Sequence, residues 1–425
     1  MKNCLRRNGS ALRRKRSRPV LKRLIKYCDK MFGLSDKIDC ISDTREEPRI
    51  PTGVFVRAGL VMFWLRLGSL NALSGSAGSM FWKEWLGDDL PSATSMGRVY
   101  SKIVCDGYRE ALHHAYTRLK RNKSLPGIGG IDAAVLDGHE SSSSYLRHCE
   151  GCLERTVHTV NGDRIQYYHR NVTIMIVGEK FRYLLDAEPQ KPGEDEVATA
   201  LRLLDRVLKV YPRAFQLVVG DALYSQARFV NFLRAHNKHV LTVLKDDRRE
   251  LYKDAMPIFA TQKPKPGKHK SSVCRWWDEE DFLSWDGVKC GIRVVRSVEK
   301  TRTKRQATGE VYIRESEWLW ATTLPKALVP TALVVRLGHA RWDVENYGFN
   351  HLVNAILADH VYRHHPTAIE AFCLASFLAA NLILAFFAFN VKTQHSPRAR
   401  TLACWARILS AELFIGVAPG VRCPP

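Results

Sequence analysis

Three carboxylates stand where neighbouring elements of a sheet could bring them together. Asp137 and Asp221 each close an apolar run of strand type, and each adjoins a glycine. A carboxylate at a strand end extends beyond the sheet, where its oxygens can bind a hard cation such as Mg²⁺. Glu345 lies on a predicted late helix, on the same face as Arg341 four residues earlier. Two ions about 4 Å apart, held by such acids, can activate an attacking oxygen and stabilise a leaving one.

Each acid also has a simpler interpretation. The two aspartates could be turn residues, and Glu345 could be a charge on a helix surface. Asp132 competes for the first position, but it begins the same strand and points to the other face, because it lies five residues before Asp137. Asp186 and Glu188 end a later strand, where we expect them to support the site or to lie on the surface.

The segment RWDVENYGFNHL (341–352) resembles the late signature of the insertion-sequence transposases of the DDE superfamily. That signature runs Tyr, two residues, Arg, three residues, Glu, six residues, Lys. Arg341 and Glu345 match it, whereas Gly338 replaces the Tyr and Leu352 replaces the Lys. In the family these two residues help to hold the DNA end. We therefore expect this chain to hold the DNA end differently at Gly338 and Leu352.

Two further segments, VLDGHE (135–140) and VVGDALYSQARFV (218–230), resemble the family's first and second acids. The resemblance implies an α/β fold with a ribonuclease-H-like mixed sheet and flanking helices. In that fold the first and fourth predicted strands lie side by side, and the Glu-bearing helix packs over them. It also implies Mg²⁺ or Mn²⁺, two ions per site, bound by Asp137, Asp221 and Glu345. Arg341 should contact a phosphate, or else pair with Glu345.

The resemblance further implies a DNA transposase of a bacterial cytoplasm, associated with the nucleoid. It would bind the terminal inverted repeats of its element as a homodimer, cleave the element ends, and join the 3′-hydroxyl ends to target DNA. A catalytically inactive or domesticated DNA-binding protein is the alternative. The uncharged stretch 371–389 has the length of a membrane span, but we expect it to be buried and the protein to need no membrane.

Periodicity and composition divide the chain into successive regions. We expect, in order, a basic arm (1–26), an all-helical DNA-binding domain (27–125), the first part of the catalytic core (126–245), a β insertion domain (246–329), the Glu-bearing helix of the core (330–365) and a C-terminal helical region (366–425).

The net charge of +22, from 65 basic and 43 acidic residues, predicts a polyanionic partner, here double-stranded DNA. The arm holds eleven of the cations, Arg13, Arg14, Lys15 and Arg16 among them, and no acid. In the insertion, Arg302, Lys304 and Arg305 accompany Trp318 and Trp320, a pair that could stack on an unpaired base or belong to the core. With 45% hydrophobic residues the chain is globular, which excludes a mostly disordered protein.

Cys149 and Cys152 have the spacing of zinc ligands, and several histidines lie nearby in the sequence. One such pair is half of a structural zinc site, so zinc, metal-free thiols and a redox pair all remain open. The odd number of 11 cysteines, with no leader-like start, favours a reducing cytoplasm.

Overall fold

The computed structural model describes residues 19–245, 249–391 and 401–414. Residues Arg13 to Arg16 of the expected arm lie outside this part. The first described region is helical, as predicted, and Ser92 caps its sixth helix by accepting a hydrogen bond from Ser95 N at 3.2 Å. Its helices are α1 (Val20–Phe32), α2 (Leu34–Asp39), α3 (Thr52–Trp64), α4 (Leu70–Ser74), α5 (Met80–Leu86), α6 (Ala93–Tyr100) and α7 (Asp106–Arg121).

Helix α1 begins inside the stretch that the sequence assigns to the basic arm. Leu21 and Leu24 are buried in the hydrophobic core, and Leu21 N donates a hydrogen bond of 2.7 Å to Glu412. Residues from Val20 onward therefore belong to the folded helical region, because their apolar face is needed for packing.

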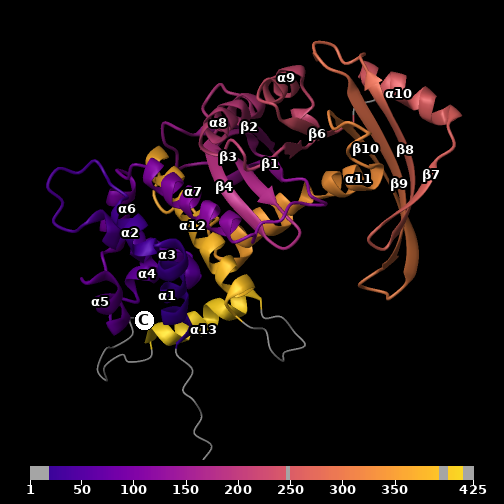
Figure 1. Cartoon of the computed structure of the whole chain (residues 1–425). Coiled ribbons are helices and arrows are strands. Elements are labelled where there is room, and N and C mark those ends of the chain that lie inside the picture. Colours follow the sequence, from indigo (N-terminus) through magenta and orange to yellow (C-terminus); the bar gives the residue numbers. More distant parts are fainter. Residues whose placement is uncertain (1–18, 246–248, 392–400, 415–425) are drawn as a thin grey trace, which may run out of the picture.

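One mixed sheet of ten strands forms the centre of the chain (Figure 1). The strand order is β2-β3-β1-β5-β6-β10-β9-β8-β7, and β4 pairs with β3. The strands are β1 (Ala133–Ser144), β2 (Leu153–Thr159), β3 (Gly162–Val177), β4 (Arg182–Pro189), β5 (Leu217–Gly220), β6 (His239–Val243), β7 (Lys265–His269), β8 (Ser272–Phe282), β9 (Ile292–Lys304) and β10 (Val311–Thr322).

The pairing of β1 with β5 fixes the geometry of the site. Ala133 lies opposite Leu217 and Val135 opposite Val219, in parallel register. The strands predicted as first and fourth are thus neighbours, and the predicted ribonuclease-H-like mixed sheet is confirmed. Helices α8 (Glu196–Val210) and α9 (Ala227–Ala235) connect the strands of this part and pack on them, and η1 (Ala222–Tyr224) follows β5 directly.

The first strand is longer than the sequence indicates. β1 continues through Asp137 to Ser144, held by antiparallel pairing with β3, and β2 is an additional strand that the sequence does not reveal. The interpretation of Asp137 as a strand end is therefore wrong for β1 itself. It holds for the pairing with β5, which ends at Val135.

The predicted antiparallel insertion is not a separate sheet. Its strand β10 pairs with β6 through Trp320 to Thr322, so β7 to β10 extend the central sheet sideways (Figure 1). Helix α10 (Glu250–Thr261) packs on β8, and α11 (Thr331–His339) packs on β6, β7 and β9.

The long apolar helix α12 (Pro366–Phe389) is a core helix. By length and composition it could cross a membrane, but 72% of its most apolar window is buried inside the protein. Trp64 Nε1 of α3 donates a hydrogen bond of 3.0 Å to Ala379 O, and the ring of Tyr100 stacks on Phe372 with centroids 3.8 Å apart. The predicted burial is confirmed. The helical start and the end of the chain, including α13 (Leu402–Phe414), share one hydrophobic core.

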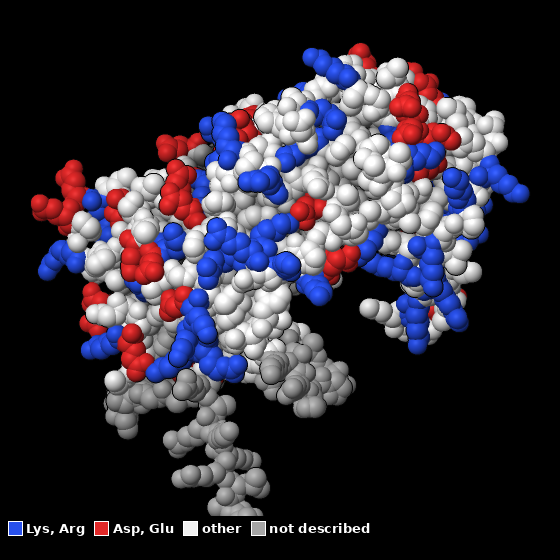
Figure 2. Space-filling view, in the orientation of Figure 1, with Lys and Arg blue, Asp and Glu red and all other residues white. Residues whose placement is uncertain are grey.

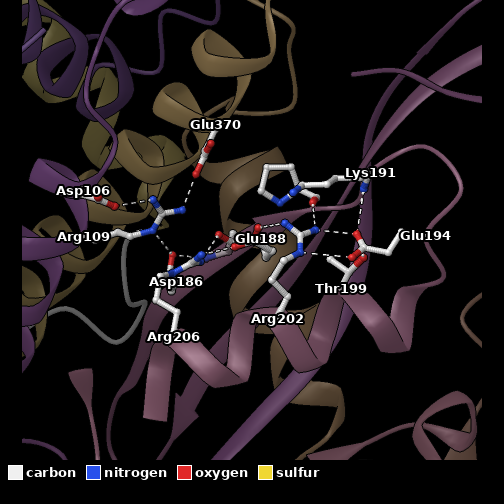
Figure 3. Close-up of polar contacts among 12 residues, drawn as sticks. Asp106, Arg109, Asp186, Glu188, Lys191, Glu194, Thr199, Arg202, Arg206 and Glu370 are labelled. Carbon is white, nitrogen blue, oxygen red and sulfur yellow. Dashed lines mark hydrogen bonds and ion pairs between the residues drawn. The ribbon is translucent and has the colours of Figure 1, made fainter. Parts of the chain in front are cut away.

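A buried network of ion pairs joins three helices to β4 (Figure 3). Asp186 and Glu188 of β4 are only 3% and 6% exposed, so the surface position, one of the two expected for them, is wrong. Arg206 of α8 pairs with both acids, and Arg109 of α7 pairs with Asp186 and with Glu370 of α12. Burying these carboxylates is tolerable because arginines from separate elements neutralise them.

Candidate active site

Asp137 lies in the middle of β1, directly beyond the point where the parallel partner β5 ends. It faces Thr173 of β3 in the register, and its Oδ1 accepts a hydrogen bond of 2.9 Å from Gly138 N. Its side chain is 14% exposed. The carboxylate is thus fixed by a central strand and remains accessible from one side.

Asp221 follows the last residue of β5. Its Oδ1 caps η1 by accepting a hydrogen bond of 2.8 Å from Leu223 N. β5 is only four residues long and fully buried. The chain turns away from the sheet at Asp221, the first polar residue after the strand. Because β1 and β5 run parallel and adjacent, Asp137 and Asp221 emerge at the same edge of the sheet.

Glu345 completes the set from a helical segment that crosses β1. The predicted late helix is divided into α11, a π-helical turn η2 (Val344–Phe349) and a second one, η3 (His351–Ala355). Such π turns re-aim side chains and are frequent at functional sites. Glu345 is 40% exposed, and its Oε1 accepts a hydrogen bond of 2.9 Å from Arg341 Nη1.

Arg341 connects the acids. Its Nη1 also lies 3.6 Å from Asp137 Oδ2, and its guanidinium stacks on the ring of Trp342. The ion pair with Glu345, which the sequence left as the alternative to a phosphate contact, is present. The side chain is 10% exposed, so most of its charge is directed at the acids rather than at solvent.

Electrostatics shows that the three acids share one environment. The pKa of Asp137 is raised to about 7, chiefly by burial and further by the negative charges of Asp221, Glu345 and Glu196, while Arg341 acts in the opposite direction. Negative charges that gather around a buried carboxylate favour a bound cation, which would neutralise them.

Glu196 is a fourth acid that the sequence analysis missed as part of the site. Its Oε1 accepts a hydrogen bond of 2.7 Å from the Tyr224 hydroxyl, and its Oε2 lies 3.1 Å from Arg170 Nη1. Gly138 makes this approach possible, because a Cβ there would lie 2.5 Å from the Glu196 carboxylate. Glu196 is the first residue of α8, where an acid is expected because it stabilises the helix dipole. Its position in the sequence therefore gave no sign of a role in the site.

The two departures from the resembled signature have physical reasons. A Cβ at Gly338 would lie 2.4 Å from the Trp320 indole, so a tyrosine cannot stand there beside that tryptophan. Leu352 is buried in η3 and belongs to the hydrophobic core, an environment that disfavours a lysine. Trp320 is itself a core residue, and Trp318 is half-buried against it and His339. This favours the core interpretation of the pair.

The rival acid Asp132 lies before β1 and away from the cluster. Its Oδ2 is 2.7 Å from Lys120 Nζ.

Cys149 and Cys152 lie together with His169, at a place distinct from the three acids. Arg302, Lys304 and Arg305 are exposed where β9 turns into β10, on the projecting end of the extended sheet, which is rich in Lys and Arg (Figure 2).

The acids fit a hard divalent cation on two observations. Their available ligand atoms are carboxylate oxygens, the donors that Mg²⁺ and Mn²⁺ prefer. The Arg341 guanidinium already lies between Asp137 and Glu345 as a positive charge, so the site is electrostatically suited to a cation.

This sheet has one acid on a central strand, a second just beyond the end of its parallel neighbour and a third on a crossing helical segment, which is the ribonuclease-H-like architecture. The profile of the family described as Transposase DDE domain matches residues 128–382, more than half of the chain. The chain therefore belongs to the DDE transposases, metal-dependent enzymes that cleave DNA in transposition. Family members generally use Mg²⁺ or Mn²⁺. A comparison with curated proteins finds no match.

Proposed function

We propose that this transposase binds the terminal inverted repeats of an insertion sequence, cleaves the DNA at the element ends and joins the 3′-hydroxyl ends to target DNA. The observation that carries the proposal is the convergence of Asp137, Asp221 and Glu345, expressed in the raised pKa of Asp137. Their oxygens would hold two divalent ions. When bound, such ions supply Lewis acids that activate the attacking oxygen and stabilise the leaving one.

The chain's own residues hold and orient the reacting groups. In this proposal Asp137 is held by β1, Asp221 by the turn that follows β5, and Glu345 by the π turn η2. Asp137, with a pKa of about 7, would give up its proton if the acids held a cation. Arg341 positions Glu345 through their hydrogen bond and would be available to pair with a phosphate next to the scissile bond.

DNA contacts outside the site come from cations. Arg302 and Lys304 lie two residues apart on β9 and both are exposed, which places them on one face of the strand. Figure 2 shows a concave surface beside this projecting end, with Lys and Arg gathered on the projecting end. Duplex DNA lying there would meet this positive charge along one side. The Arg13–Arg16 arm adds further phosphate contacts in this proposal.

We also infer that two chains bind in each DNA complex, because an element has two ends that must be joined to one target. We infer further that the protein acts in the bacterial cytoplasm, on nucleoid DNA. Measuring the molecular mass of the protein with and without element-end DNA tests the number of chains in the complex. A complex that holds two ends and two chains supports it, and a complex of one chain with one end contradicts it.

The direct test uses labelled duplexes that carry the inverted repeats flanking the gene. With Mg²⁺ or Mn²⁺ the wild-type chain should nick at the repeat boundary and then join the new 3′-hydroxyl to a target plasmid. EDTA should leave binding intact and abolish both products. Binding without cleavage under every metal condition would instead establish the alternative, an inactive or domesticated DNA-binding protein.

A further inference from the structure

Two cysteines and a histidine outside the acid site lie at mutual distances suited to a metal ion. Cys149 Sγ lies 3.9 Å from Cys152 Sγ, and His169 Nε2 lies 3.3 Å from the first sulfur and 3.2 Å from the second. All three ligand atoms fall within 4.8 Å of one another. Cys152 and His169 are each 8% exposed, and Cys149 is half-buried.

These distances match a tetrahedral zinc site. Zn–S bonds of about 2.3 Å and Zn–N bonds of about 2.0 Å at tetrahedral angles place two sulfurs about 3.8 Å apart and a sulfur and a nitrogen about 3.5 Å apart. The sulfur–sulfur distance of 3.9 Å is close to that value. It is far longer than the roughly 2.05 Å of a disulfide. We propose that Cys149, Cys152 and His169 bind a structural Zn²⁺ ion.

The local backbone is already arranged around the sulfurs. Cys152 N donates to Cys149 O at 3.0 Å, Cys149 N donates to Cys152 Sγ at 3.2 Å, and the Gly151 N–H bonds to the Cys149 sulfur. The ligands therefore need little rearrangement to close on an ion. Burial raises the pKa of the Cys149 thiol to about 11, so zinc binding would displace its proton.

His364 lies outside this group of three, and in this proposal its ring turns toward the group to supply the fourth ligand. Its Nδ1 is buried with no hydrogen-bond partner among the described residues, and burial together with the charge of His364 lowers the pKa of His169. The neighbouring Pro366 packs on Gly151, because a Cβ built on that glycine would lie 3.2 Å from the proline ring. The segment before α12 thus already contacts the cysteine turn.

The ion would join three parts of the fold. Cys149 and Cys152 belong to the turn between β1 and β2, His169 belongs to β3, and His364 lies two residues before the start of α12. β1 and β3 are the paired strands that hold Asp137 and Thr173 opposite each other. A zinc ion here would fix the far part of this strand pair to α12, and so support the acid site without belonging to it.

The test is metal analysis of the full-length, tag-free chain purified under reducing conditions without chelators. We expect one zinc ion per chain, and replacement by Co²⁺ should give thiolate-to-cobalt charge-transfer absorption. Cys149→Ser, Cys152→Ser and His169→Gln should each lose the ion and the absorption, while Cys290→Ser, at a half-buried cysteine elsewhere, should retain both. His364→Gln should bind zinc at least tenfold more weakly, and unchanged affinity would overturn its assignment.

A folded wild-type chain without zinc, or zinc retained when both cysteines are serine, would overturn the site. Measuring the zinc that a chelator releases from the wild-type chain gives the same information without any variant. Misfolding of a variant therefore cannot affect the result. Asp137→Asn and Asp221→Asn should keep their zinc, which separates this inference from the fate of the proposed catalytic site.

Discussion

Arg341 Nη1 lies 3.6 Å from Asp137 Oδ2, so an arginine of the crossing helical segment contacts the acid of the central strand. The same nitrogen donates to Glu345 at 2.9 Å. One cation thereby holds together two acids that belong to separate elements, more than 200 residues apart in the chain.

Arg341→Gln should slow end cleavage by about 100-fold, since it removes a positive charge from the reacting phosphate and the hydrogen bond that orients Glu345. The measurement is the single-turnover nicking rate of end DNA at saturating protein. Arg336→Gln is the matched control, because Arg336 lies on the preceding helix and pairs with Glu179 instead. An Arg341 variant that nicks at the wild-type rate would refute the assigned role.

Asp137→Asn should stabilise the metal-free protein at about pH 8. The pKa of Asp137 is raised from 3.8 to about 7, mainly by burial. Between these values the folded chain holds a proton that the unfolded chain has released, so stability falls as the pH rises, and the full cost is present above pH 7. The gain is up to about 4 kcal/mol at pH 8 and less than half of that near pH 5.

Urea unfolding in EDTA at the two pH values measures this difference. The effect should disappear when Mg²⁺ saturates the wild-type site, because bound metal stabilises only the folded wild-type chain. If Asp137→Asn instead lowers the free energy of unfolding at pH 8, the pKa of the Asp137 carboxylate is not raised in the folded chain.

Asp186→Asn should reduce the free energy of unfolding by about 3 kcal/mol, because it removes the buried carboxylate that Arg206 and Arg109 of the network in Figure 3 share. Arg206 then keeps one acid, Glu188, and Arg109 keeps Glu370 and the exposed Asp106. Asp205→Asn offers a matched comparison. It breaks the exposed pair with Lys209 on the same helix α8, and should cost about 0.5 kcal/mol or less. Equal losses from the two variants, measured by chemical denaturation, would argue against a stabilising network.

The double variant Arg302→Ala/Lys304→Ala should weaken binding to DNA of any sequence and lower the salt slope by roughly 0.9 for each phosphate that the two cations neutralise. Lys209→Ala/Arg213→Ala removes two cations at the exposed end of α8 and should leave the slope unchanged. Fluorescence titrations over a range of salt concentrations supply the slopes. If the two double variants behave alike, the projecting end of the sheet does not bind DNA.

Much of the acid site could be predicted because it depends on local sequence. Asp221 follows a short buried run that must be a strand, and the spacing of Arg341 and Glu345 places them on one face of any helical turn, which is where their hydrogen bond forms. The adjacency of the first and fourth predicted strands came from the family resemblance, since strand order is a long-range property.

The features that were missed depend on contacts between distant residues. β1 extends through GHESSSS, residues of low strand preference, because β3 supplies a partner along this whole length. Glu196 joins the site through Tyr224 and Arg170, neither of which is near it in sequence. Asp186 and Glu188 are buried only because arginines from two helices reach them, and His169 meets the cysteines through the pairing of β2 with β3.

The most direct test of the catalytic assignment compares four variants in one end-cleavage assay with Mg²⁺. Asp137→Asn, Asp221→Asn and Glu345→Gln should each bind end DNA with wild-type affinity and lose cleavage by at least about 1,000-fold, because each removes a metal-binding carboxylate. Asp132→Asn, whose acid pairs with Lys120 away from the cluster, should cleave normally. Normal cleavage by any of the three, or loss of cleavage in Asp132→Asn alone, would contradict the assignment.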